Sequence, residues 1–218
     1  MPFFSMYDAT HQDVDMELVR SGLFLGSQQA EEAPVITLKN YGITHVVQLG
    51  TDNVTMCPSH PDDFRYLCIT IADKDEVDLI EALRRYKALE FMDTALQQQG
   101  SILVHCQMGM SRSATTVMAY LITRERLSFW DALVQTISAR RRVQPNPGFC
   151  RQLKSLANLE GDLMLYKGPD ATFITNDFLW LQLIDKAQTA AVVDLLRSTQ
   201  RRSIAVVSQQ NMEDAPKA

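Results

Sequence analysis

The stretch SILVHCQMGMSRSATTVMAYLI, residues 101–122, passes from an apolar strand pattern through a short polar turn into the pattern of a buried helix. The run Ser101–Cys106 has the length and apolar content of a strand. The residues after Arg112 are mostly small or apolar, as in a helix that other elements cover. Strands that alternate with helices form sheets with helices packed against them. The stretch therefore predicts an α/β fold.

The rest of the chain shows the same alternation of short apolar runs and longer amphipathic segments. Three further runs have the pattern of strands, namely Leu23–Ser27, Thr44–Gly50 and Tyr66–Ile71. Strands give way to helices in the C-terminal half. We expect a mostly parallel central sheet of about five strands, flanked by helices.

Amphipathic spacing and capping residues predict the helices. The segment Asp78–Gly100 places six apolar side chains on one face and ends at a glycine, so we expect one continuous helix there. These six are Leu79, Leu83, Tyr86, Leu89, Met92 and Leu96. Ser128 and Asp131 have the spacing of a capping box at the start of another helix. Asn146 followed by Pro147 predicts the start of a third.

Composition and charge narrow the class of protein. With 46% hydrophobic residues and a net charge of -5, the chain can bury a sizeable core and should bind neither nucleic acid nor a membrane. No uncharged apolar run is long enough to span a membrane, and the N-terminus lacks a secretory pattern. The four cysteines show no metal-ligand or disulfide spacing. We expect a cytoplasmic or nuclear protein that uses no metal or other cofactor.

The turn between strand and helix has the features of a phosphate-binding site. Backbone N–H groups of a loop that enters a helix point inward, and the helix N-terminus adds roughly half a positive charge. Gly109 allows a tight curl, and the planar guanidinium of Arg112 can hold two phosphate oxygens. We expect a phosphate cradle made by six residues: Gln107, Met108, Gly109, Met110, Ser111 and Arg112.

Cys106 lies at the base of this cradle. A thiol in such a positive field has a pKa of roughly 3.5 to 7.5, so it can attack a bound phosphate monoester in line as a thiolate and form phosphocysteine. Ser113 can donate a hydrogen bond to the sulfur when it leaves, and His105 should brace the loop rather than act as a base. A cysteine at a strand end is more often a small buried apolar residue. The spacing of Cys106, Gly109, Arg112 and Ser113, however, meets several chemical demands together.

HCQMGMSRS, residues 105–113, matches the HCxxGxxRS signature of the cysteine-dependent protein tyrosine phosphatases, and the surrounding sequence resembles their dual-specificity branch. The stretches that carry the resemblance are GLFLGSQQAEE, GITHVVQLG, YLCITIADKD and VQPNPGFCRQL, in the same order as in that branch. The turn is most similar to the loops of Slingshot and MAP-kinase phosphatases. The resemblance implies a phosphatase fold with three regions: an N-terminal segment 1–17, a catalytic domain 18–160 and a largely helical C-terminal extension 161–218.

The resemblance also implies a general acid that protonates the leaving oxygen. The family's acid follows the strand that begins at Tyr66 by a fixed distance, which matches Asp73. On residue chemistry alone Asp75 remains an alternative, whereas Asp78 is better placed to cap the next helix. The same cluster could also be only a solvated acidic loop.

A few further residues allow two interpretations. The arginines at 140–142 could offer a guanidinium to a second phosphate or an acidic substrate side chain, or could complement the dipole of the helix that they end. Asn146 should cap its helix and steady the neighbouring loop. Cys68 and Cys150 are expected in the core, with a disulfide to oxidised Cys106 as the alternative.

The variable positions of the cradle favour phosphoproteins over phosphoinositides as substrates, because they supply no extra cation. We therefore predict a dual-specificity protein phosphatase that hydrolyses phosphotyrosine and phosphoserine or phosphothreonine. The alternative is a phosphate-binding pseudophosphatase or adaptor that recognises phosphoproteins without turnover. The apolar segment 176–197 predicts a helix that packs on the domain, on a second copy of the chain or on a partner protein.

Overall fold

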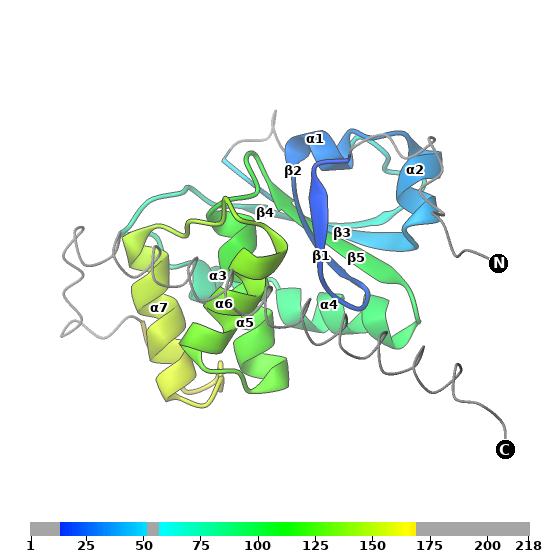
Figure 1. Cartoon of the computed structure of the whole chain (residues 1–218). Helices are drawn as coiled ribbons and strands as arrows, with labels where there is room; N and C mark the ends of the chain where they lie inside the picture. Colours follow the sequence, from blue (N-terminus) through cyan, green and yellow to red (C-terminus); the bar gives the residue numbers. More distant parts are fainter. Residues whose placement is uncertain (1–13, 52–56, 169–218) are drawn as a thin grey trace, which may run out of the picture.

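The computed structural model describes residues 14–51 and 57–168, and the helix predicted over 176–197 lies outside them. The chain alternates strands and helices as expected (Figure 1). The elements are β1 (Met16–Arg20), β2 (Leu23–Ser27), α1 (Gln28–Glu31), α2 (Val35–Asn40), β3 (Ile43–Gly50), β4 (Arg65–Thr70), α3 (Leu79–Arg85), α4 (Ala88–Gln97), β5 (Ser101–Cys106), α5 (Arg112–Glu125), α6 (Phe129–Ala139) and α7 (Pro147–Asn158).

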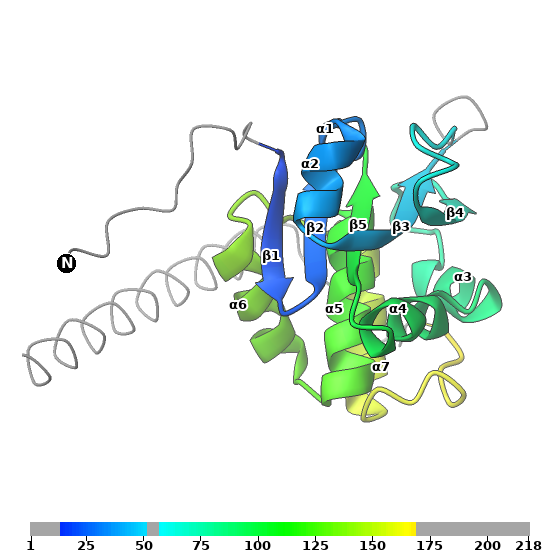
Figure 2. The same ribbon diagram turned by 90° about the vertical axis from the view of Figure 1, so that its right-hand side faces the viewer.

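The strands form one five-stranded sheet in the order β1-β2-β5-β3-β4. β1 is antiparallel to β2 and the other neighbouring strands are parallel, which confirms the predicted mostly parallel sheet (Figure 2). Because β5 is the middle strand, its last residue, Cys106, lies between Ser27 of β2 and Leu49 of β3. Ligands bind open α/β sheets at the carboxyl ends of the strands, where Cys106 lies.

Helices cover both faces of the sheet, with α1 and α2 on one face and α3 to α7 on the other (Figures 1 and 2). Successive strand residues point to opposite faces, so each parallel strand contributes to two cores. In β5, Val104 packs into the larger core with α3 to α7, whereas Leu103 packs into the smaller core with α2. The middle strand is therefore covered by an apolar core on each face.

Helix α5 runs through the larger core directly after the loop that follows Cys106. It is buried from Arg112 to Thr123, because α3, α6 and α7 pack around it and its other side lies on the sheet. A helix covered on all sides belongs to a domain core. None of the helices in the described ranges is both long enough and apolar enough to cross a membrane.

The continuous helix predicted over Asp78–Gly100 is wrong. The structure divides this segment into α3 and α4, because Lys87 adopts a left-handed conformation with φ 52°. A left-handed residue cannot continue a right-handed helix. Tyr86 is 37% exposed and does not share the buried face expected for it. The predicted helix cap at Asp78 is confirmed, since its side chain accepts a hydrogen bond of 2.9 Å from the Glu81 amide.

Helix α6 begins as predicted and ends earlier than predicted. The Ser128 hydroxyl accepts a hydrogen bond of 3.1 Å from the Asp131 amide, which is the expected cap. The last helical residue is Ala139, and the residue after it, Arg140, is extended with φ -132° and ψ 100°. Residues 140–142 therefore do not form the last turn of the helix, and the dipole interpretation does not apply to them.

The packed domain is longer than residues 18–160 at both ends. Strand β1, which its alternating charged and apolar residues did not reveal, begins at Met16. Leu163 and Tyr166 are buried in the larger core, beyond the expected C-terminal limit. Between them and α7, Gly161 lies so close to α5 that an added Cβ would meet the Ile122 carbonyl oxygen at 2.6 Å. The chain therefore still belongs to the domain where it reaches residue 166.

Candidate active site

Residues 107–111 join β5 to α5 as an irregular loop, which we call the phosphate loop. Each of its carbonyl groups accepts a hydrogen bond from outside the loop, at 2.8 to 3.3 Å. Three donors are backbone amides: Gln28 donates to the Gln107 carbonyl, Gln144 to the Met110 carbonyl and Thr115 to the Ser111 carbonyl. The other two belong to the Arg140 side chain, whose Nη2 donates to the Met108 carbonyl and whose Nε donates to the Gly109 carbonyl. In a trans peptide the carbonyl and the following N–H point in opposite directions. The amides of residues 108–112 therefore point away from these donors, toward the interior of the loop.

Gly109 satisfies two constraints in this loop. Its φ of 67° is in the left-handed region, which favours glycine. An added Cβ would also lie 2.5 Å from the Gly26 carbonyl oxygen and 2.7 Å from Nη2 of Arg140. Any larger residue would push the loop away from β2 and away from the arginine that holds its carbonyls.

Cys106 is 3% exposed, and its Sγ accepts a hydrogen bond of 3.2 Å from the Ser113 hydroxyl. Burial raises the pKa of this thiol. The Ser113 hydroxyl and amide, the Arg112 charge and the Gly109 amide together outweigh burial and lower the Cys106 pKa below its ordinary value. A buried thiol stabilised as a thiolate is a nucleophile. The structure thus brings together three of the residues predicted from the turn.

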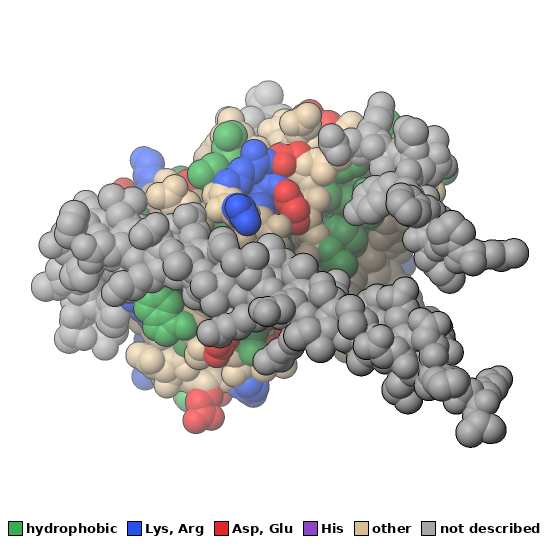
Figure 3. All heavy atoms as spheres, viewed as in Figure 1, with side chains coloured by type: hydrophobic (Ala, Val, Ile, Leu, Met, Phe, Trp, Pro, Cys, Tyr) green, Lys and Arg blue, Asp and Glu red, His purple; other side chains and the backbone are tan. Residues whose placement is uncertain are grey.

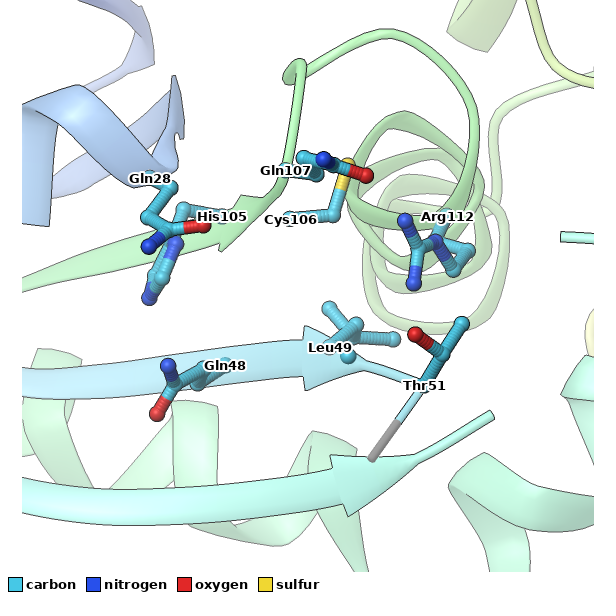
Figure 4. Close-up of a pocket in the computed structure, with 9 residues that line it drawn as sticks. Gln28, Gln48, Leu49, Thr51, His105, Cys106, Gln107 and Arg112 are labelled. Carbon is cyan, nitrogen blue, oxygen red and sulfur yellow. The ribbon is translucent and has the colours of Figure 1, made fainter. Parts of the chain in front are cut away.

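Arg112 is the first residue of α5 and lies beside Cys106 (Figure 4). Its side chain is 7% exposed, and Nη1 donates to the Ile71 carbonyl oxygen at 3.4 Å. Nε is buried and has no hydrogen-bond partner among the described residues. Nε also lies 3.9 Å from Oδ2 of Asp73. The buried guanidinium thus keeps Nε as a donor that could make a charge-assisted hydrogen bond to a phosphate oxygen.

Asp73 and Asn146 meet the phosphate loop at Ser111. Oδ1 of Asp73 accepts hydrogen bonds of 2.7 Å from the Ser111 hydroxyl and 2.7 Å from Nδ2 of Asn146. The Asn146 side chain also caps α7 by accepting a hydrogen bond of 2.8 Å from the Phe149 amide. Asn146 therefore both caps its helix and holds the acidic loop, as expected. The other carboxylate oxygen of Asp73, Oδ2, lies 3.9 Å from Nε of Arg112.

An open hollow of about 580 Å³ contains the predicted acid and nucleophile together. Asp73, Cys106 and Arg112 line it, with Met108 and Pro147 among its apolar lining residues. Asp75 is not among its lining residues. The Asp75 carboxylate lies instead 3.7 Å from Nη2 of Arg151. Position alone therefore favours Asp73 over Asp75 as the acid, a choice that residue chemistry left open.

Helix α7 fixes the acidic loop in place. An added Cβ on Gly148 would lie 2.0 Å from the Asp75 carbonyl oxygen, so only glycine allows this close packing. Oε1 of Gln152 accepts hydrogen bonds from the Leu79 amide at 2.9 Å and the Ile80 amide at 3.3 Å, and Nε2 donates to the Val77 carbonyl oxygen at 2.7 Å. These buried contacts hold the segment after Asp73 against the helix that Asn146 begins.

His105 lies on the opposite face of β5 from Cys106, in accordance with strand alternation (Figure 4). Burial lowers its pKa to about 4, although the nearby Glu31 carboxylate raises it. The ring is therefore neutral at pH 7. Both ring nitrogens are buried, and the Cys106 backbone beside the ring also raises its pKa.

The sequence did not reveal the role of Arg140. Its side chain is 1% exposed and lies against the outer side of the phosphate loop, not at the rim of the hollow. Arginine is seldom fully buried without a partner, and no local pattern marks such a position.

Cys150 is buried in the larger core as expected, and Cys68 is half-buried. Both are free thiols, and burial raises the pKa of each.

Comparisons with known proteins agree with this geometry. The family model "Dual specificity phosphatase, catalytic domain" matches residues 23–158. Dual specificity protein phosphatase 1B of Arabidopsis thaliana is 41% identical over 140 residues, which cover 64% of this chain and 80% of that protein. Human tyrosine phosphatase-like serine/threonine/tyrosine-interacting protein has a similar structure, with TM-score 0.63, 31% identity and coverage of 67% of this chain and 97% of that one. Human DUSP28 also has a similar structure, with TM-score 0.61, 31% identity and coverage of 66% of this chain and 94% of that one.

Replacing Ser113 tests the stabilisation of the thiolate. Ser113→Ala removes a hydrogen bond that favours the anion, so the Cys106 pKa should rise. The pH at which iodoacetamide alkylates Cys106 half-maximally should then rise by the same amount, as measured by peptide mass spectrometry. Thr94→Ala, which removes a helix hydroxyl on α4, should leave the profile unchanged. An unshifted profile in Ser113→Ala would contradict this account of the thiol.

Proposed function

This chain belongs to the dual specificity phosphatase family, and from that membership we propose a chemical role for each residue of its site. As a member it is a cysteine-dependent protein phosphatase that hydrolyses phosphotyrosine and phosphoserine or phosphothreonine. One observation carries the assignment of roles. A thiol with a lowered pKa lies beneath inward-pointing loop amides and beside a buried arginine whose Nε has no hydrogen-bond partner among the described residues. Since Cys106 and Arg112 are both present and adjacent, the alternative of a pseudophosphatase is not favoured.

The first proposed step transfers the phosphoryl group to sulfur. The amides of residues 108–112 and the Arg112 guanidinium bind the phosphate oxygens, which places the phosphorus above Cys106. The thiolate attacks in line, an S–P bond forms, and the bond from phosphorus to the substrate oxygen breaks. Fixed donors of this kind stabilise the charge of the transition state without having to reorganise.

Asp73 is the proposed acid for this step. The leaving oxygen of a serine, threonine or tyrosine side chain needs a proton, and the carboxylic acid of Asp73 supplies it from Oδ2. The hydrogen bonds from Ser111 and Asn146 to Oδ1 fix the orientation of the carboxyl group. The contacts of α7 with the acidic loop keep the carboxyl group in place before substrate arrives.

The second proposed step releases phosphate. The Asp73 carboxylate now accepts a proton from water, the water oxygen bonds to phosphorus, and the S–P bond breaks to regenerate the thiolate. The Ser113 hydroxyl, 3.2 Å from the sulfur, stabilises the negative charge that returns to it. The thiolate, the guanidinium and one carboxyl group suffice for this cycle, so the proposed chemistry calls for no metal cofactor.

We propose phosphoproteins as the substrates and the cytoplasm or nucleus as the location. The hollow is open and partly apolar, with Met108 56% exposed beside it, so a folded protein surface can approach it. A reducing compartment keeps the nucleophilic thiol available, which is the physical reason for the location. The partner contact proposed for residues 176–197 lies outside the described residues.

Removing the nucleophile tests the assignment directly. Wild type should release phosphate from phosphotyrosine and phosphothreonine peptides in buffer that contains chelator and reductant. Cys106→Ser should lower turnover by about a thousandfold or more while it retains phosphopeptide binding. Phosphate release and peptide binding are measured side by side. Binding without turnover in wild type, or activity that chelator abolishes and metal restores, would contradict the proposal.

The two candidate acids can be separated by the leaving group. Asp73→Asn should slow hydrolysis of a phosphothreonine peptide by about a hundredfold or more, because its alkoxide leaves poorly without a proton. The loss should be smaller with p-nitrophenyl phosphate, whose leaving group needs little protonation. Asp75→Asn is the matched control and should change both rates little. The opposite result for the two variants would assign the acid to Asp75.

A further inference from the structure

An ion pair lies on the outer side of the phosphate loop, away from the hollow. Nε of Arg140 donates to the Gly109 carbonyl oxygen at 2.9 Å and Nη2 donates to the Met108 carbonyl oxygen at 3.1 Å. Two consecutive peptide groups of the loop are thus held by one buried side chain. Because the guanidinium is rigid and planar, its orientation fixes both carbonyls together.

Asp15 fixes the orientation of that guanidinium. Its two carboxylate oxygens accept hydrogen bonds of 2.9 Å from Nη1 and 3.1 Å from Nη2 of Arg140. Glu17 also accepts from Nη1, and the exposed Arg142 pairs with Asp15 from the solvent side. Figure 3 shows basic and acidic side chains in contact on this face of the molecule. Each guanidinium nitrogen of Arg140 is therefore engaged in a hydrogen bond.

The pair is strong enough to be a structural constraint. Exposed ion pairs contribute little to stability, but Arg140 is almost fully buried, and removal of Asp15 would leave its charge with the more exposed Glu17 as its carboxylate partner. Burial raises the pKa of Asp15, yet hydrogen bonding to Arg140 and the charges of Arg140 and Arg142 lower it to about 2. The carboxylate therefore stays ionised throughout the pH range of an enzyme assay.

The ion pair is linked to the nucleophile through single peptide planes. The plane that carries the Met108 carbonyl also carries the Gly109 amide, which points in the opposite direction and is one of the groups that lower the Cys106 pKa. The plane that carries the Gly109 carbonyl likewise carries the Met110 amide. When Arg140 holds the two carbonyls outward, it holds these two amides inward.

We propose that Asp15 and Arg140 are positioning residues for the phosphate site, which lock two loop amides toward the bound phosphate and Cys106. The catalytic consequence rests on the proposed function, whereas the effect on anion binding does not. Asp15 precedes β1, and the family match begins only at residue 23. The site is therefore completed by a segment of the chain that lies before the matched region.

The test compares Asp15→Asn with Asp93→Asn. A side-chain amide at position 15 cannot accept two charge-assisted hydrogen bonds, so the arginine and the loop should lose their fixed orientation. Asp93 offers the same substitution on α4, where its carboxylate accepts from Arg124 and Tyr120 and does not touch the loop. Asp15→Glu keeps the carboxylate and should recover most of the wild-type behaviour.

Two readouts that need no turnover report on the loop. In a Cys106→Ser background, Asp15→Asn should weaken tungstate binding by on the order of tenfold to a hundredfold, measured by calorimetry. With Cys106 present, its iodoacetamide alkylation profile should move to higher pH. Asp93→Asn should change neither. Thermal melts of every variant separate these effects from loss of the fold.

The outcomes are distinguishable. If Asp15→Asn lowers the melting temperature but leaves tungstate affinity and the alkylation profile as in wild type, the pair is only structural and the inference is wrong. If Arg140→Lys, which keeps the charge but not the fork, behaves as wild type in both readouts, the inference is also wrong. If the Cys106→Ser protein that carries no second substitution binds no tungstate, the phosphate loop is not an anion site. In that case the proposed function is wrong, independently of Asp15 and Arg140.

Discussion

The site depends on the outward orientation of the carbonyl groups of the phosphate loop. Left to itself, a short loop between a strand and a helix exposes carbonyls and amides on both sides. Here each carbonyl of residues 107–111 is bound by a donor from outside the loop, so the amides after them face inward. The sheet order makes this possible, because β2 lies next to β5 and brings the start of α1 beside the loop.

Two buried arginines lie next to this loop, and they differ in whether their N–H groups are all bonded within the protein. Arg140 uses each of its guanidinium nitrogens within the protein, on the outer side of the loop. Arg112 keeps a buried Nε without a hydrogen-bond partner among the described residues, 3.9 Å from Oδ2 of Asp73. Since a buried donor without a partner costs free energy, the second arrangement is what a site that awaits an anion should show. In the proposed mechanism, the charge that shapes the loop is therefore separate from the charge that binds the phosphate.

The parts of the fold that follow from local chemistry could be predicted from the sequence. The strands Leu23–Ser27 and Ser101–Cys106 and the caps at Asp78, Ser128 and Asn146 depend on neighbouring residues, and the structure has them as expected. The break at Lys87 could not be predicted, because a left-handed lysine has no sequence signature and is held by the packing of α3 and α4 on either side.

In the site, too, the features set by neighbouring residues could be predicted, and those set by distant contacts could not. Cys106, Arg112 and Ser113 are close in sequence, so the turn alone predicts their contact. The preference for Asp73 over Asp75 depends on how α7 packs against the acidic loop, and the role of Arg140 depends on Asp15, more than a hundred residues away in the chain. Contacts between residues so distant in sequence exist only in the folded chain, so residue type and spacing cannot predict them.

The most direct measurement is a titration of the ¹⁵N-labelled protein with inorganic phosphate, followed by the backbone amide shifts. The account predicts that the amides of residues 108–112 shift together and with one dissociation constant, because they bind the same anion. Loop amides that stay unchanged while the largest shifts occur elsewhere, for example around the hollow lined by Lys39 and Arg65, would contradict it.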